Sequence, residues 1–132
     1  MIRTADIRDY LALKRAIAAE VFAPDSAFQP SRRELSEGLA RDIEVNDEQW
    51  SYSAGQRGYV FTNPRRRFSV VISEDRAAND YFTSDELARY LQCYTTTENI
   101  TDLLVDNWCA MACRDGLLER RGPTQVAYRL AR

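Results

Sequence analysis

Residues 82–130, FTSDELARYLQCYTTTENITDLLVDNWCAMACRDGLLERRGPTQVAYRL, decide the fold that we predict for this chain. They predict a helix, a turn, a longer helix and a two-stranded hairpin. Thr83 can cap the first helix while Glu86, three residues later, reaches back to the cap, which is the pairing called a capping box. Thr95 and Glu98 repeat that spacing, so the second helix is predicted to start there.

The second helix is predicted to be buried along one side. Its apolar residues recur at helical spacing: Ile100, Leu103, Leu104, Trp108 and Met111. Gly116 is expected to end the helix, because glycine adopts the left-handed conformation at low cost. The apolar period then changes to two, which predicts one strand from Leu118 and another in which Val126, Tyr128 and Leu130 alternate.

This order of elements resembles the C-terminal part of a winged helix-turn-helix domain. The resemblance rests on the ELARYL helix, the long second helix, and the run RDGLLERRGPTQVAYRLA at 114–131, which looks like the end of a recognition helix followed by a wing. In that family the second helix usually enters the major groove of DNA, and the wing contacts the backbone or the minor groove. The resemblance implies an α+β, winged-helix-like fold, mostly helical with two β-hairpins.

The charge of the second helix departs from the family's usual way of docking. If the apolar residues face inward, the opposite side presents Asn99, Asp102, Asp106 and Ala110, with Glu98 beside them. No Lys or Arg occurs on this helix before Arg114. Duplex DNA is densely negative, and its affinity for proteins comes largely from cations that replace its counterions. An acidic stripe is repelled by DNA and fits a basic protein surface instead.

The composition is that of one globular domain spanning residues 1–132. Hydrophobic residues make up 45% and charged residues 29% of the chain, and the net charge is -2, so there is no overall basic signature for nucleic acid. No apolar run approaches membrane-spanning length, and the N-terminus MIRTADIRD lacks the features of a secretory signal. We therefore expect a cytoplasmic protein that does not act in a membrane.

The residues that usually carry enzyme chemistry are scarce. The chain has no histidine, which is the commonest general base and metal ligand, and it has no Gly-rich phosphate loop or nucleophile elbow. Three cysteines, Cys93, Cys109 and Cys113, fall short of the four ligands of a structural zinc site and are expected to be small buried hydrophobes. We expect a protein that is not an enzyme and that holds no metal or cofactor.

The N-terminal part, residues 4–54, is predicted to be helical. Residues 4–22 carry apolar side chains at helical spacing, and Pro24 stops the run. A further capping box, Ser31 with Glu34, predicts a second helix that continues through Ile43. Asn46 and Gln49 then suggest a short helical turn that runs through Trp50 and Tyr52.

Residues 58–73 are predicted to form a hairpin, with strands at 59–62 and 68–72 joined by an Asn-Pro turn. Arg65, Arg66 and Arg67 lie at its tip, which is the most basic spot in the chain. A solvated loop and a contact to phosphate or to an acidic partner are both open interpretations. A polar connector, 74–81, leads to the winged-helix-like part at 82–131, and whether the two halves are a structural repeat stays open.

Two functions follow from these patterns. By analogy with the winged-helix family, the chain is a transcriptional regulator that binds duplex DNA as a homodimer. Its expected DNA contacts are Arg65, Arg66, Arg67, Thr95, Thr97, Asn99, Arg120, Arg121 and Arg129. The alternative is a protein-binding inhibitor or adaptor, of the kind that a phage or mobile element encodes. In that case Glu98, Asp102 and Asp106 engage a basic, nucleic-acid-binding surface of the partner protein. The analogy favours DNA, and the charge argument opposes it.

Overall fold

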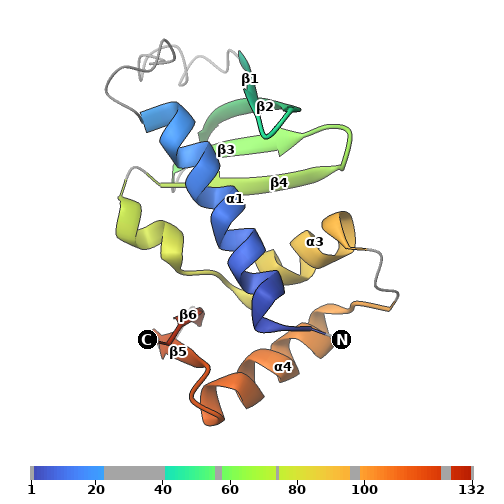
Figure 1. The fold of residues 1–132 in the computed structure, drawn as a ribbon, viewed down its shortest axis with the longest axis vertical. Helices are drawn as coiled ribbons and strands as arrows, with labels where there is room; N and C mark the ends of the chain where they lie inside the picture. The colour runs from blue at the N-terminus through green and yellow to red at the C-terminus, as the bar shows by residue number, and fades with distance from the viewer. Residues whose placement is uncertain are drawn as a thin grey trace. The chain divides into compact units, whose positions relative to one another are not determined.

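The computed structural model describes residues 2–22, 41–55, 58–73, 75–95, 99–122 and 126–131 (Figure 1). Their contacts divide into two units: unit 1 holds Met1–Leu11 and Asp80–Arg132, and unit 2 holds Ala12–Asn79. The described residues form three α-helices, a four-stranded antiparallel sheet and a two-stranded sheet. The predicted α+β class is confirmed.

Helix α1, Thr4–Phe22, has the bounds that the sequence predicts. Its first residues belong to unit 1 and the rest to unit 2. Of the apolar positions that define its predicted buried side, Ile7, Tyr10, Leu11, Ile17 and Val21 are buried and Phe22 is half-buried. Buried Lys14 fills the gap between Leu11 and Ile17, so the buried positions follow one another at intervals of three or four residues along one side of the helix.

Unit 2 is built on a sheet in the order β1-β2-β3-β4. Its strands are β1 (Arg41–Val45), β2 (Glu48–Gly55), β3 (Gly58–Asn63) and β4 (Phe68–Ile72). The later part of α1 crosses in front of this sheet in Figure 1, and the ring centroids of Phe22 and Tyr59 are 5.5 Å apart. The hairpin predicted for residues 58–73 is confirmed as β3 and β4.

The predicted helix through Ile43 and the helical turn over residues 46–52 are wrong where the structure describes them, because these residues form the β1–β2 hairpin. Val45 pairs with Glu48, which leaves only Asn46 and Asp47 as the turn. Both turn residues have positive φ, 52° and 63°, as a two-residue hairpin turn of this twist requires. The capping box at 31–34 lies outside the described residues.

Gly58 holds β3 close to β4. Its φ is +151°, and a Cβ placed there would lie 2.6 Å from the carbonyl oxygen of Ile72. Any larger residue would push the two backbones apart, so glycine is required at this position. On β4, Phe68, Val70 and Ile72 are buried while the alternate residues are exposed, which is the pattern of a strand with one covered face.

Unit 1 contains the elements that suggested the winged-helix resemblance. They are α3 (Ser84–Tyr94), α4 (Asp102–Arg114), β5 (Leu118–Arg121) and β6 (Ala127–Leu130). A further strand position precedes α3: the N–H groups of Phe82 and Tyr128 each donate to the other residue's carbonyl oxygen, at 2.9 and 2.8 Å. The β5–β6 hairpin is therefore extended by a bridge at Phe82.

Helix α3 begins as predicted. The Thr83 hydroxyl accepts from the backbone N–H of Glu86 at 3.2 Å, and the Glu86 carboxylate accepts from the backbone N–H of Thr83 at 3.3 Å, so the capping box is complete. The predicted stripe of Leu87, Tyr90 and Leu91 is buried. The sequence signal and the local structure therefore agree here.

The predicted start of the second helix is wrong. Thr95 is the C-cap of α3, and its hydroxyl donates to the Leu91 carbonyl at 2.6 Å. Helix α4 begins at Asp102, with Thr101 as N-cap accepting from the N–H of Leu104 at 3.1 Å. Asn99 has φ 64°, in the left-handed region, which helical residues do not adopt, so the helix starts after it.

The end of α4 and the hairpin after it agree with the sequence. Gly116 has φ 78°, which confirms the left-handed residue predicted at the end of the helix. Strand β5 starts at Leu118, as predicted, and pairs antiparallel with β6, in which Tyr128 is buried. Residues 123–125 of the connection lie outside the described part.

Candidate interaction surfaces

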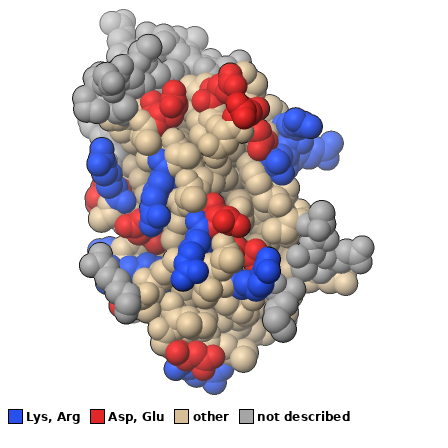
Figure 2. Space-filling view, viewed as in Figure 1, with Lys and Arg blue, Asp and Glu red and all other residues tan. Residues whose placement is uncertain are grey.

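Charged side chains are mixed on the face that Figure 2 draws. Acidic and basic groups alternate across it, and no extended patch of one sign is visible there. No group of three or more metal-ligating side chains occurs among the described residues. In the same part of the chain, no helix has both the length and the apolar character needed to cross a membrane.

Helix α4 faces the rest of unit 1 with a different side from the predicted one. Its buried residues are Val105, Cys109 and Ala112. Leu104 is exposed and Trp108 is only half-buried, so the prediction that both are buried is wrong. The inward side chains are small, and packed helix axes approach more closely when the side chains between them are small. Helix α4 packs against α3 and β5 in this way.

The larger apolar side chains of α4 consequently lie in solvent. Leu103 is 70% exposed, Leu104 47% and Met111 54%. At about 100° per residue these three side chains lie within one sector of the helix, opposite the buried side, and exposed Asn107 and Arg114 lie in the same sector. We call Leu103, Leu104 and Met111 the apolar α4 face. Leu117, just after the helix, is also exposed at 46%.

Acidic side chains border the apolar α4 face. Asp102 and Asp106 are both exposed, as the sequence predicts. They lie on one flank of the apolar face and do not form a separate stripe opposite a buried apolar side. Asp106 also accepts a hydrogen bond from the Ser84 hydroxyl at 3.3 Å, which links α4 to the first residue of α3. Glu98, the third member of the predicted stripe, lies outside the described residues.

The thiols of α4 are poorly suited to reaction chemistry. Burial raises the pKa of Cys109 to about 12, with smaller contributions from Cys113 and Asp106, and burial also raises the pKa of Cys113. Both thiols are therefore protonated near neutral pH, and a thiol is a weaker nucleophile and metal ligand than a thiolate. None of Cys93, Cys109 and Cys113 takes part in a disulfide bond.

The arginines of the β5–β6 hairpin lie around one aromatic ring. The guanidinium carbons of Arg121 and Arg129 are 5.1 and 5.4 Å from the centroid of the Tyr81 ring. Arg129 also donates to Glu119 at 2.6 Å, so its charge is partly compensated. Arg120 and Arg121 are exposed. They are the members of the predicted wing set that present most cationic surface.

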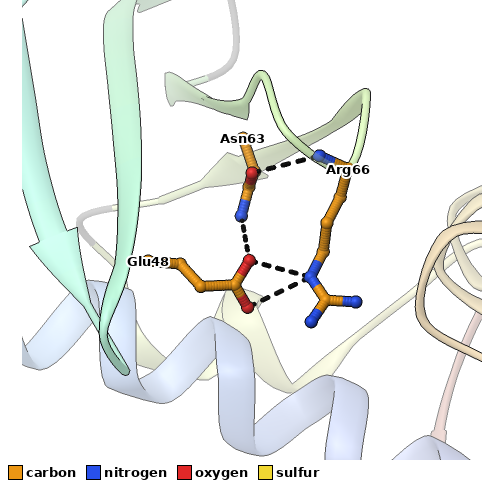
Figure 3. Close-up of polar contacts among 3 residues, drawn as sticks. All are labelled: Glu48, Asn63 and Arg66. Carbon is orange, nitrogen blue, oxygen red and sulfur yellow. Dashed lines mark hydrogen bonds and ion pairs between the residues drawn. The ribbon is translucent and has the colours of Figure 1, made fainter.

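The arginine turn of unit 2 is partly structural. Figure 3 shows Arg66 directed at Glu48, with its Nε 2.8 and 3.1 Å from the two carboxylate oxygens. The side-chain amide of Asn63 donates to Glu48 at 2.7 Å, and its oxygen accepts from the backbone N–H of Arg66 at 3.2 Å. Hydrogen bonding from Arg66, with a smaller contribution from Asn63, lowers the pKa of Glu48 despite its partial burial.

Arg66 thus links the β3–β4 turn to β2. All three arginines of the predicted set, Arg65, Arg66 and Arg67, are exposed. These three belong to unit 2, whereas Arg120, Arg121 and Arg129 belong to unit 1.

The residues predicted to contact DNA from the start of the second helix do not lie at the start of a helix where the structure describes them. Thr95 is engaged in the C-cap of α3, Asn99 is an exposed turn residue, and Thr97 lies outside the described residues. The actual N-terminus of α4 presents Thr101 and Asp102. A Thr-Asp pair at the start of a helix is visible in the sequence, but the earlier threonines compete with it as candidate caps.

No protein-family model, curated protein or solved structure matches this chain. Function is therefore inferred from the surfaces themselves.

Proposed function

We propose that this chain is a small, non-enzymatic regulatory protein of the cytoplasm that binds another protein through the apolar α4 face. The observation that carries the proposal is the exposure of Leu103, Leu104 and Met111 on one sector of a regular helix. Exposing several large apolar side chains together has a free-energy cost in water, and such patches on soluble proteins mark interaction sites. A partner that covers this sector removes that cost.

The flank of the apolar face indicates the chemistry of the partner. Asp102 and Asp106 are exposed beside it, and Asp85 follows Ser84, the residue that hydrogen-bonds to Asp106. A protein surface with an apolar centre and a rim of Lys or Arg complements both features. Where that basic rim normally contacts nucleic acid, this chain acts as an inhibitor of nucleic-acid binding.

The arrangement of unit 1 supports a winged-helix-like frame for this interaction. Helices α3 and α4 and the β5–β6 hairpin follow one another in the order on which the resemblance rests, and the bridge at Phe82 precedes them; unit 2 begins within α1 and ends at Asn79. Helix α4 takes the place of the recognition helix. Its apolar outer face suits a protein better than a DNA groove, and a fold of this kind does not by itself specify DNA.

A selection from a displayed random peptide library on the immobilised full chain tests the proposal. We expect the enriched peptides to combine large apolar residues with Lys or Arg. They should lose binding to a Leu103→Asp, Met111→Asp variant and keep binding to Glu44→Arg, a charge reversal at an exposed position of β1 in unit 2. Enrichment of peptides that bind the Asp variant equally well would contradict the proposal.

Duplex DNA is a second candidate target, which the exposed arginines of the β5–β6 hairpin favour. Arg120 and Arg121 are exposed, and Arg121 is stacked over Tyr81. In this case the hairpin contacts phosphates, and α4 does not enter the groove in the usual way.

Binding of random duplex DNA at two salt concentrations tests the second candidate. Arg120→Ala with Arg121→Ala should weaken binding to all sequences and reduce the salt slope by about one unit for each phosphate that the variant no longer neutralises. Absence of binding at low salt would reject it.

A further inference from the structure

Helix α4 carries three sulfur atoms, and that of Met111 lies in the most exposed side chain. Met111 is 54% exposed, whereas Cys109 is buried and Cys113 is half-buried. A cysteine reacts with oxidants as its thiolate, and burial raises the pKa of both Cys109 and Cys113. The thioether of methionine has no proton to lose. An oxidant in solution therefore reaches the Met111 sulfur without deprotonation and without any opening of the packed side of α4.

The position of Met111 makes this sulfur part of the candidate binding surface. It is the one member of the apolar α4 face in the C-terminal half of the helix, because Leu103 and Leu104 lie in the first turn. Its neighbours in the same sector, one turn before and one turn after, are the polar residues Asn107 and Arg114. A change in the polarity of the Met111 side chain therefore leaves this half of the face without a large apolar group.

We propose that Met111 is a site of reversible oxidation, and that methionine sulfoxide at this position prevents the apolar α4 face from binding its partner. This inference rests on the proposed function. The oxidant is a peroxide: a lone pair of the sulfur attacks one peroxide oxygen, the O–O bond breaks, and the other oxygen leaves as water. A methionine sulfoxide reductase reverses the change, with two thiols that become a disulfide while the sulfoxide oxygen leaves as water.

The sulfoxide opposes binding through its hydrogen-bonding needs. Its oxygen accepts hydrogen bonds from water as long as Met111 is exposed. A partner whose apolar residues cover Met111 removes that water and offers no donor in exchange. Burying a polar group without a hydrogen bond is unfavourable, so the free chain is stabilised relative to the complex. Methionine-rich and apolar interfaces are disrupted by this oxidation for the same reason.

The fold itself should be insensitive to the oxidation. Helix α4 packs through Val105, Cys109 and Ala112, which lie on the side away from Met111. The added oxygen lies in solvent in the free chain, and changes at exposed positions usually alter stability little. Oxidation of Met111 thus changes binding and leaves the structure intact, unlike oxidation of a methionine in a protein core.

Treating the full chain with hydrogen peroxide, and then with dithiothreitol to return reversibly oxidised cysteines to thiols, tests the proposal. Mass spectrometry should show that Met111 is oxidised in the native protein at a rate within about threefold of the rate in urea. The library-selected peptide should bind the oxidised chain about tenfold more weakly than the untreated chain. The urea midpoint should stay the same, and a methionine sulfoxide reductase with dithiothreitol should restore the affinity. Saturating peptide should slow the oxidation of Met111.

Two variants isolate the contribution of this sulfur. Met111→Leu removes it and keeps the other methionine, Met1, and all three cysteines. The affinity of this variant for the peptide should be the same before and after peroxide. Met111→Gln places a polar side chain of similar length on the helix without any oxidant, and should bind the peptide about tenfold more weakly than wild type.

The outcomes separate this inference from the proposed function. Oxidation of Met111 that is far slower in the native protein than in urea would overturn the inference, because the sulfur would then be shielded. The same holds if a peptide that fails to bind Leu103→Asp, Met111→Asp binds the oxidised and untreated chains equally, and the proposed function would stand. Peptides that bind that double variant as tightly as wild type would overturn both.

Discussion

The hydroxyl of Tyr10 donates to Oε2 of Glu86 at 2.7 Å, while Oε1 of the same carboxylate accepts from the backbone N–H of Thr83. One side chain therefore completes the cap of α3 and holds α1 beside it. The Tyr10 ring lies 4.9 Å from the Tyr90 ring of α3, centroid to centroid, so an aromatic contact supports the same junction. This junction fixes the first helix of unit 1 against the second.

Replacing Tyr10 by Phe keeps the aromatic contact and removes the hydrogen bond. We expect the free energy of unfolding to fall by about 1.5–3 kcal/mol, the range for a hydrogen bond to a charged group. Burial, followed by the charge of Glu86, raises the pKa of Tyr10 well above its ordinary value of 10.0. The stabilisation is thus complete below pH 10.0 and is lost as the pH rises through the higher folded-state pKa. The free energy of unfolding, measured by urea denaturation at a series of pH values, should decrease more steeply above pH 10.0 for wild type than for Tyr10→Phe. The same decrease with pH in both proteins would contradict this.

Truncating two neighbouring side chains of α4 should change the free energy of unfolding by very different amounts. Val105 is fully buried, so Val105→Ala should destabilise the protein by about 1.5–3 kcal/mol. Leu104 is exposed, so Leu104→Ala should change stability by less than about 0.5 kcal/mol. Thermal or chemical denaturation of the two variants checks which side faces inward. A larger loss for Leu104→Ala would favour the orientation of α4 that the sequence alone predicts.

In the Glu48–Asn63–Arg66 cluster, the buried amide of Asn63 should contribute more to the stability of the protein than the ion pair between Arg66 and Glu48. Asn63→Ala should cost about 1–3 kcal/mol, because Asn63 is buried and bonds to both partners. Arg66→Ala should cost about 0–1 kcal/mol, since this pair is partly exposed. Glu48 has a lowered pKa, so its contribution is present above its ordinary value of 4.5 and is lost as the pH falls through the lower folded-state pKa. Chemical denaturation at pH 7 measures both losses, and equal values in the two variants would contradict this ranking.

Cys109 should be protected from alkylation in the native state. Its side chain is buried and its pKa is raised to about 12, so almost no thiolate exists at pH 8. We expect iodoacetamide to modify Cys109 at least about a hundredfold more slowly in the native protein than in urea. Mass spectrometry of the labelled peptides at successive times measures this ratio. Equal rates in both conditions would show that the α4 interior is open.

The local helix signals were predictable from the sequence. The Thr83–Glu86 box and Gly116 both depend on residues within one turn of each other, and both appear in the structure. The β1–β2 hairpin is not predicted, because Asn46 fits a helix cap as well as it fits a hairpin turn. The signal that identifies the hairpin is the alternation of Ile43, Val45, Trp50 and Tyr52 around a two-residue turn.

The spacing of apolar residues alone could not predict which side of α4 is buried. Apolar residues occur on two sides of this helix, and spacing identifies both without ranking them. Close packing against α3 and β5 favours the smaller set, Val105, Cys109 and Ala112. The set of larger side chains, Leu103, Leu104 and Met111, is therefore exposed. The candidate binding surface thus depends on tertiary packing, which no local sequence pattern encodes.

The most direct test of the proposed function is the affinity of a library-selected peptide for four forms of the full chain, measured by calorimetry. Leu103→Asp, Met111→Asp should weaken binding by about tenfold or more, because two apolar contacts are replaced by charge. Asp102→Asn, Asp106→Asn should weaken it at low salt and much less at high salt. Glu44→Arg should match wild type. Equal affinity for all four forms would contradict the claim that the apolar α4 face binds the partner.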